Sequence, residues 1–121
     1  MPDMQMGAVE ARFADIIWSH QPVTAAQLAK YADAELGWKK TTAYTVLKRL
    51  CEKGIFQNEK GMVTALVTRE QFYAMQSERF VEETFAGSLP AFIAAFAKRK
   101  NISREELAQI RAMLDRYEQE G

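Results

Sequence analysis

The chain has 121 residues, 48% hydrophobic and 26% charged, with sixteen basic residues balancing sixteen acidic ones, a composition near the average for globular domains. Its longest apolar run, "LPAFIAAFA", is far shorter than the roughly 20 residues that cross a bilayer, and no signal-peptide pattern opens the sequence, so we expect a cytoplasmic protein without membrane insertion. One cysteine and one histidine exclude an internal disulfide and leave no ligand set for zinc or copper, so we expect no metal and no cofactor.

The first part of the chain predicts two helices separated by a break. Over residues 8–18, apolar side chains recur at the spacing of one helix face, and they are Val9, Phe13, Ile16 and Ile17. After the break at "QPV", the segment "VTAAQL" carries a helix start signal, because Thr24 can serve as the N-cap and Gln27 as its reciprocal partner. A second helix should therefore run from this cap towards Ala34 and end before Gly37.

A third helix and a hairpin should follow. The helix is predicted from about Lys40 and should stop at Gly54, because glycine favours the left-handed conformation at helix C-termini. The runs "IFQN" and "MVTALV" are rich in β-forming residues, and Gly61 between them suits a tight turn, so we expect a two-stranded hairpin. Three helices followed by a hairpin make a winged helix-turn-helix domain, which we place at residues 1–69.

Residues 70–121 predict a helical tail, which makes the expected fold mainly α-helical with a small β-hairpin. The segments "REQFYAMQSERFVEETFAG", "SLPAFIAAFAKRK" and "SREELAQIRAMLDRYEQE" carry apolar residues at helical spacing. The last one opens with Ser103 and Glu106 as a capping box and continues with the spacing of a coiled-coil seam. This tail has too little chain for a separate core, so we expect it to form a homodimer. The predicted dimerisation residues are Phe80, Phe85, Leu89, Phe92, Ile93, Phe96, Leu107, Ile110, Leu114 and Tyr117.

The predicted third helix lies in the segment with the strongest charge asymmetry. Between residues 38 and 54, five lysines and arginines oppose one glutamate, a net charge of +4 in a chain that is neutral overall. Wound at ~100° per residue, residues 41–52 place apolar side chains on one side and hydroxyls, an aromatic ring and cations on the other. These groups suit the major groove of DNA, where cations bind phosphates or guanine and methyl groups contact thymine.

Further DNA contacts are expected at two other places. The start of the second helix, near Thr24, offers backbone amides for a phosphate, and Lys60 in the hairpin turn can reach another from the wing. The first residues of the third helix should contact bases, as in other recognition helices. The predicted DNA-binding residues are Thr24, Lys39, Lys40, Thr41, Thr42, Tyr44, Thr45, Lys48, Arg49 and Lys60.

Several segments together resemble the penicillinase-repressor family of winged-helix regulators. They are "IIW", "TTAYTVLKRLCEKG", "VTREQF", "FVEETFAGSLPAFIAAFAK" and "REELAQIRAMLD", which follow the family's order over nearly the whole chain. The resemblance implies a homodimer that binds an inverted-repeat operator in its own promoter region. It also implies repression that lasts until the tail is cut or a signal weakens DNA binding.

Two departures from the family concern its partners and signals. The family implies a membrane sensor-protease partner that cuts β-lactam-responsive members at an Asn-Phe pair, whereas the matching position here is Ala95-Phe96. Copper-responsive members carry Cys-x-Cys motifs near the C-terminus, and this tail has no cysteine. We therefore do not expect copper sensing, and the resemblance leaves the inducing signal open.

Two other functions are compatible with the sequence. A pI of about 6.6 fits a winged-helix protein-interaction module without DNA binding. The aromatic residues of the tail fit a ligand-sensing one-component regulator whose effector lies between wing and tail. No paired-carboxylate, Ser-His or Cys-His arrangement is evident, so we do not expect an enzyme. We assign His20 no function, and we expect Cys51 to be an ordinary small buried thiol at the edge of the inner face of the third helix.

Overall fold

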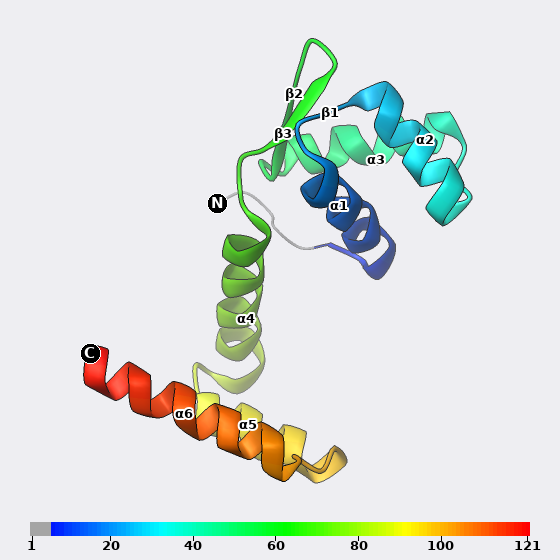
Figure 1. The fold of residues 1–121 in the computed structure, drawn as a ribbon. Coiled ribbons are helices and arrows are strands. Elements are labelled where there is room, and N and C mark those ends of the chain that lie inside the picture. The colour runs from blue at the N-terminus through cyan, green and yellow to red at the C-terminus, as the bar shows by residue number, and fades with distance from the viewer. Residues whose placement is uncertain (1–5) are drawn as a thin grey trace. The chain divides into compact units, whose positions relative to one another are not determined.

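The computed structural model describes residues 6–121, which form two compact units. The first unit ends at Glu78 and the second begins at Arg79, so the division falls inside the fourth helix. Figure 1 shows a mainly helical chain with one small sheet, which confirms the predicted fold class. The elements in order are α1 (Ala8–His20), β1 (Val23–Thr24), α2 (Ala25–Leu36), α3 (Lys40–Glu52), β2 (Phe56–Glu59), β3 (Met62–Ala65), α4 (Arg69–Phe85), α5 (Leu89–Arg99) and α6 (Arg104–Glu120).

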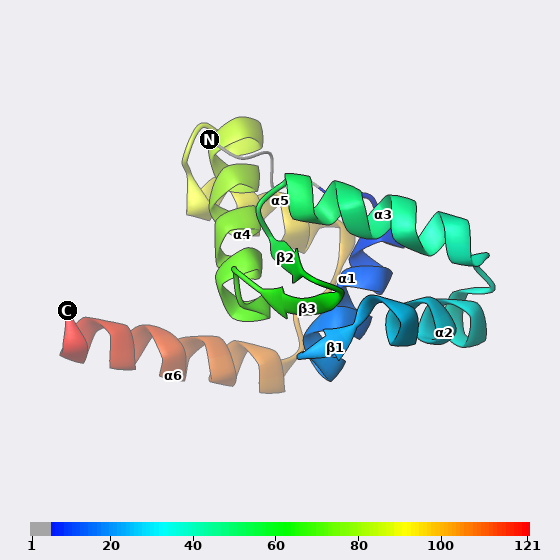
Figure 2. The same cartoon turned by 90° about the horizontal axis from the view of Figure 1, so that it is seen from above.

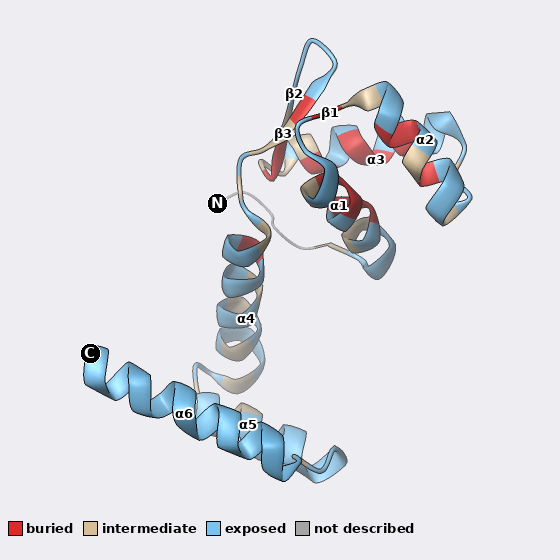
Figure 3. Cartoon of the chain, viewed as in Figure 1, coloured by how far each residue is buried: buried red, intermediate tan, exposed pale blue. Residues whose placement is uncertain are grey.

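One hydrophobic core holds the first unit together. Each of α1, α2 and α3 turns one apolar stripe inwards, and the red segments of Figure 3 mark these stripes and the adjoining strands. Burying a large aliphatic or aromatic side chain contributes about 1.5–3 kcal/mol relative to leaving it exposed. The largest fully buried side chains are Phe13, Ile17, Leu28, Leu50, Ile55, Phe56 and Val63.

The two tryptophans pack against this core with different partners. The Trp38 ring, between α2 and α3, lies 5.2 Å from the ring of Phe13 in α1. The Trp18 ring packs 5.2 Å from Phe56 and 5.6 Å from Phe72, and its Nε1 donates a hydrogen bond to the carbonyl of Val67 at 2.9 Å. Trp18 therefore ties α1 both to the sheet and to the first turn of α4.

The sheet has three strands, whereas the sequence predicted only two. Figure 2 shows β1, β3 and β2 side by side, and both pairings are antiparallel. Val23 pairs with Val63, and Thr24 with Met62, so the segment read as a simple break contributes an edge strand. A two-residue strand is too short to show an alternating pattern, and its partner lies about forty positions away in the chain.

The hairpin turn has the geometry that its sequence predicts. Lys60 and Gly61 connect β2 to β3, and both have positive φ angles, 52° and 88°. Two positive φ values match the backbone of the two-residue turns that suit twisted strands. The side-chain oxygen of Asn58 accepts a hydrogen bond from the amide of Gly61 at 2.9 Å, which closes the turn.

Side-chain caps are present at the starts of α2 and α6, with one difference from the prediction. At α2 the full capping box is present, since Thr24 and Gln27 each accept a hydrogen bond from the other's backbone amide at 3.1 Å. At α6 the Ser103 hydroxyl accepts from the amide of Glu106, but the Glu106 carboxylate accepts from that hydroxyl instead of from the backbone. The α6 cap is therefore only half of the predicted box.

The second unit contains the end of α4 together with α5 and α6. The rings of Phe80, Phe85 and Phe92 lie 5.7–5.9 Å apart at steep angles, and Phe96 continues the cluster 6.3 Å from Phe92. No residue of α5 or α6 is buried in the single chain, and neither helix carries red in Figure 3. Within residues 6–121, no single helix is long and apolar enough to cross a membrane. In that range, α4 and α5 meet the length and hydropathy criteria when taken together, but a sharp bend separates them.

Candidate nucleic-acid interface

The two sides of α3 differ as the helical winding predicted. Ala43, Val46, Leu47 and Leu50 are buried, and they hold the helix on the core. The opposite side is exposed, and so is the residue that precedes the helix. The predicted contact residues on this outer face are Lys39, Lys40, Thr41, Thr42, Tyr44, Thr45, Lys48 and Arg49.

Some groups on the outer face are already engaged. The Thr45 hydroxyl donates a hydrogen bond to the carbonyl of Thr41 at 2.9 Å, so what it can still offer a partner is its methyl group and its two acceptor lone pairs. The Lys40 ammonium lies 5.7 Å from the centre of the Tyr44 ring, within the range of a cation–π contact. Tyr44 is 36% exposed, so its ring stays accessible beside the start of α3.

The amides at the start of α2, near Thr24, are mostly occupied, whereas the sequence led us to expect them to be free. The amides of Thr24 and Gln27 are used in the capping box, and that of Ala25 donates to the carbonyl of Gly61 at 2.8 Å. Three of the four amides that were expected to hold a phosphate therefore have protein partners. The same bond from Ala25 brings the start of α2 against the hairpin turn, so Thr24 and the exposed Lys60 lie at the same end of the sheet.

The positive charge of the α3 segment is smaller in the fold than in the sequence. Glu10 of α1 reaches the C-terminal end of α3, where its carboxylate lies 3.0 Å from the Lys53 ammonium and 3.5 Å from the Arg49 guanidinium. The net charge of residues 38–54 did not include this glutamate, because it lies 39 positions before Arg49 in the chain. Lys39 and Lys48 form no ion pair within residues 6–121, so they keep their charge for an external partner.

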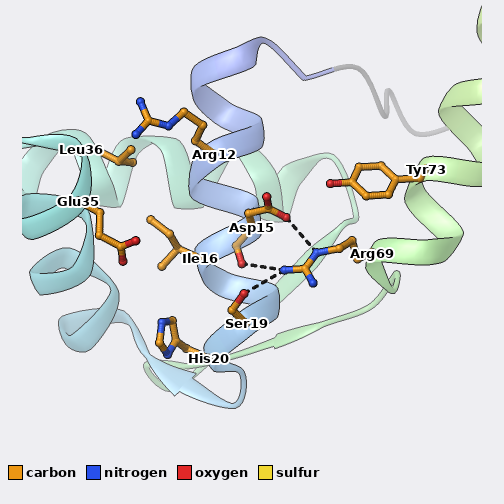
Figure 4. Close-up of a pocket in the computed structure, with 9 residues that line it drawn as sticks. All are labelled: Arg12, Asp15, Ile16, Ser19, His20, Glu35, Leu36, Arg69 and Tyr73. Carbon is orange, nitrogen blue, oxygen red and sulfur yellow. Dashed lines mark hydrogen bonds and ion pairs between the residues drawn. The ribbon is translucent and has the colours of Figure 1, made fainter. Parts of the chain in front are cut away.

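A second feature that the sequence did not reveal is a clamp at the start of α4, drawn in Figure 4. Arg69 donates from Nε to the Asp15 carboxylate at 2.9 Å, and from Nη2 to the Asp15 carbonyl at 3.1 Å and to the Ser19 hydroxyl at 3.0 Å. Its guanidinium also lies 5.8 Å from the centre of the Trp18 ring. The clamp borders a surface cleft of about 510 Å³, which is lined by Arg12, Asp15, Ile16, Ser19, His20, Glu35, Leu36, Arg69 and Tyr73.

His20 and Cys51, for which no special chemistry was predicted, have ordinary surroundings. The His20 ring stacks on the ring of Tyr31, with centroids 4.1 Å apart and planes 12° from parallel. Cys51 is half-buried, and burial, followed by the negative charge of Glu52, raises the pKa of its thiol above the usual value. A raised pKa keeps the thiol protonated and poorly nucleophilic at neutral pH. Among residues 6–121, no group of histidine, cysteine and acidic side chains is placed to hold a metal ion.

The predicted dimerisation residues fall into two groups. Phe80, Phe85, Phe92 and Phe96 contact one another within the chain, although Phe80 and Phe96 remain half exposed. The others are exposed on α5 and α6, together with Met113, which was not among the predicted residues. The exposed apolar residues of these helices are Leu89, Ile93, Phe96, Leu107, Ile110, Met113, Leu114 and Tyr117. The Ala95-Phe96 pair lies inside α5.

Comparison with known proteins places this geometry in a family. The family model of the penicillinase repressor matches residues 6–116. The chain is also similar to the penicillinase repressor of Bacillus licheniformis, with 23% identity over 117 residues that cover 93% of this chain and 91% of that protein. Because the family model spans most of the chain, it confirms the resemblance that the motifs indicated: the chain belongs to the penicillinase repressor family.

Proposed function

We propose that this protein is a transcriptional repressor that binds DNA as a homodimer, at an inverted-repeat operator in its own promoter region. The observation that carries the proposal is the outer face of α3, which exposes threonines, a tyrosine and cations while its inner face is buried. Membership of the penicillinase repressor family supports the same function.

The groups on α3 divide naturally between phosphates and bases. Lys39, Lys40 and Lys48 are exposed cations on flexible stems, which suits them to phosphate oxygens. Thr41 and Thr42 lie in the first turn, the part of a recognition helix that meets base edges. Thr45 presents a methyl group that suits a thymine methyl, and its oxygen can only accept hydrogen bonds because its proton is already donated within the helix.

The hairpin supplies a wing in this proposal. Lys60 stands exposed at the hairpin turn and can bind a backbone phosphate. Thr24 contributes mainly by capping α2, because three of the four amides around it are already bonded within the protein. We therefore assign the phosphate contact of this region to Lys60.

The tail makes the protein a dimer in this proposal. The exposed apolar side chains of α5 and α6 form one apolar surface. Removing such a surface from water is favourable by about 25 cal/mol per Å². A second copy offers the same side chains, so a two-fold contact is self-complementary. Linking two modest half-site contacts in this way raises the affinity for a full operator by ~10²–10⁴.

A gel-shift titration tests the proposal. The protein is titrated against the DNA directly upstream of its own gene and against an unrelated duplex of the same length and base composition, at several salt concentrations. We expect tighter binding to the upstream DNA, with an affinity that falls steeply with salt because phosphate contacts release counterions. Equal or absent binding to both duplexes would contradict the proposal and favour a protein-interaction module.

The cleft beside Arg69 favours ligand sensing as a second candidate function. Its volume of about 510 Å³ falls within the range of small-molecule sites, although the cleft is open to solvent, and its lining includes Arg12 and Glu35 with opposite charges. In this alternative an effector would bind beside the first turn of α4, and not between wing and tail as the sequence suggested. Thermal-shift screening of the full chain against small-molecule libraries tests it, since a specific ligand must raise the melting temperature.

A further inference from the structure

Glu10 lies where it can compete with DNA for the cations of α3. It belongs to the first turn of α1, yet its side chain is only 19% exposed because it reaches the C-terminal end of α3. One carboxylate oxygen lies 3.5 Å from the Arg49 guanidinium and the other 3.0 Å from the Lys53 ammonium. The contact thus joins the first helix of the fold to the helix that carries the candidate DNA interface.

The two cations differ in how much DNA can still reach them. The Lys53 side chain is 17% exposed, so this cation lies largely inside the α1–α3 contact. The Arg49 side chain is 53% exposed, and its 3.5 Å separation from Glu10 is long for an ion pair. Arg49 can therefore leave Glu10 for a phosphate at small cost, whereas Lys53 keeps the Glu10 carboxylate in place.

Resting on the DNA-binding function proposed above, we infer that Glu10 is a positioning residue that competes with DNA phosphates for Arg49 and so limits the affinity for DNA. A carboxylate at this place lowers the affinity in two ways. It holds Arg49 in an internal pair, and its negative charge repels any phosphate that approaches the end of α3. The Lys53 contact keeps that charge next to Arg49 whether or not DNA is bound.

The substitution Glu10→Gln should consequently tighten DNA binding, although Glu10 itself contacts no DNA. Loss of one partly exposed ion pair corresponds to about a two- to fivefold gain in affinity near 0.1 M salt. If Arg49 gains a phosphate, the slope of log affinity against log salt should steepen by about 0.9. The gain should therefore shrink as the salt concentration rises.

Asp15→Asn is the matched control. Asp15 lies on the same helix and its loss changes the net charge by the same amount, but its partner is Arg69 and not a cation of α3. Fluorescence anisotropy of a labelled duplex from the protein's own promoter would be measured for the wild type, both single variants and the double variant Glu10→Gln with Arg49→Gln. Melting temperatures of all proteins show that each variant is folded, and Glu10→Asp, which keeps the charge, serves as a milder second test.

We expect Glu10→Gln to bind DNA more tightly and with a stronger dependence on salt, and Glu10→Asp to show an intermediate gain in affinity. Asp15→Asn should show no comparable gain. The gain of Glu10→Gln should be lost when Arg49 is also replaced. If the wild type binds its promoter but Glu10→Gln binds no better, or Asp15→Asn gains as much, the inference is wrong and the proposed function stands. If the wild type binds no DNA, the proposed function and this inference fail together.

Discussion

At the scale of single residues, the cations of α3 are not equivalent. Lys48 is exposed, and within residues 6–121 it forms no ion pair, whereas Arg49 shares Glu10 with Lys53. Adjacent basic residues on one helix can therefore contribute differently to DNA binding. The sequence alone predicted the same role for both cations, because Glu10, which distinguishes them, belongs to another helix.

Lys48→Ala should weaken binding to every DNA sequence to a similar degree. The reason is that a lysine on a phosphate adds affinity without reading bases, so the salt slope should fall by about 1 while specificity is kept. Anisotropy titrations at several salt concentrations measure both quantities. Lys100→Ala, which removes an exposed lysine at the end of α5, is the control and should leave binding unchanged.

Arg69→Ala should destabilise the first unit. It removes three hydrogen bonds to Asp15 and Ser19 and the contact with Trp18, but these groups are partly exposed, so we expect a loss of only about 1–2 kcal/mol. Urea unfolding followed by tryptophan fluorescence measures it, with Arg104→Ala in α6 as the control. A change below a few tenths of a kcal/mol would show that the clamp carries no net stability.

At the scale of elements, local signals predicted most of the fold and long-range contacts explain what they missed. The helices, the Thr24 capping box and the Lys60–Gly61 turn follow from residues within a few positions of one another. The strand β1, the Glu10 pair and the Arg69 clamp all join residues about 40 or more positions apart, and no local pattern encodes them. The outer face of α3 was predictable because helix periodicity alone separates buried from exposed positions.

Thr24→Ala tests the value of one local signal. The threonine side chain caps α2, so its loss should lower the free energy of unfolding of the first unit by about 0.5–2 kcal/mol. Because the start of α2 also adjoins the hairpin turn, protection of the Ala25 amide from hydrogen exchange should fall as well. Thr84→Ala, an exposed position inside α4, is the control and should not destabilise the protein.

At the scale of the whole molecule, the two units bury their apolar residues to different extents. Among residues 6–121, all the large side chains that are fully buried belong to the first unit, whereas α5 and α6 contain no buried residue in the single chain. This exposed apolar surface is the reason for the proposal that a second copy of the chain covers α5 and α6. In the proposed function, dimerisation and DNA contact thus belong to different parts of the chain.

Leu114→Glu should therefore produce a monomer without unfolding the first unit. Leu114 is 57% exposed on α6, and a charge there would be costly only if another chain covers it. Light scattering coupled to size-exclusion chromatography measures the mass, and tryptophan fluorescence reports on the first unit. The matched control is Leu66→Glu, which changes a leucine that is 55% exposed outside the tail. A Leu114→Glu protein that keeps the wild-type mass of a dimer would exclude this seam as the interface.

The most direct test of the central claim is the stoichiometry of the complex between the full-length protein and the DNA upstream of its own gene. Sedimentation velocity with labelled duplex gives the mass of the complex at rising protein concentration. We predict two chains on each operator, bound cooperatively and released by salt. One chain per site, or no salt-sensitive complex with this DNA, would contradict the account of a dimeric repressor.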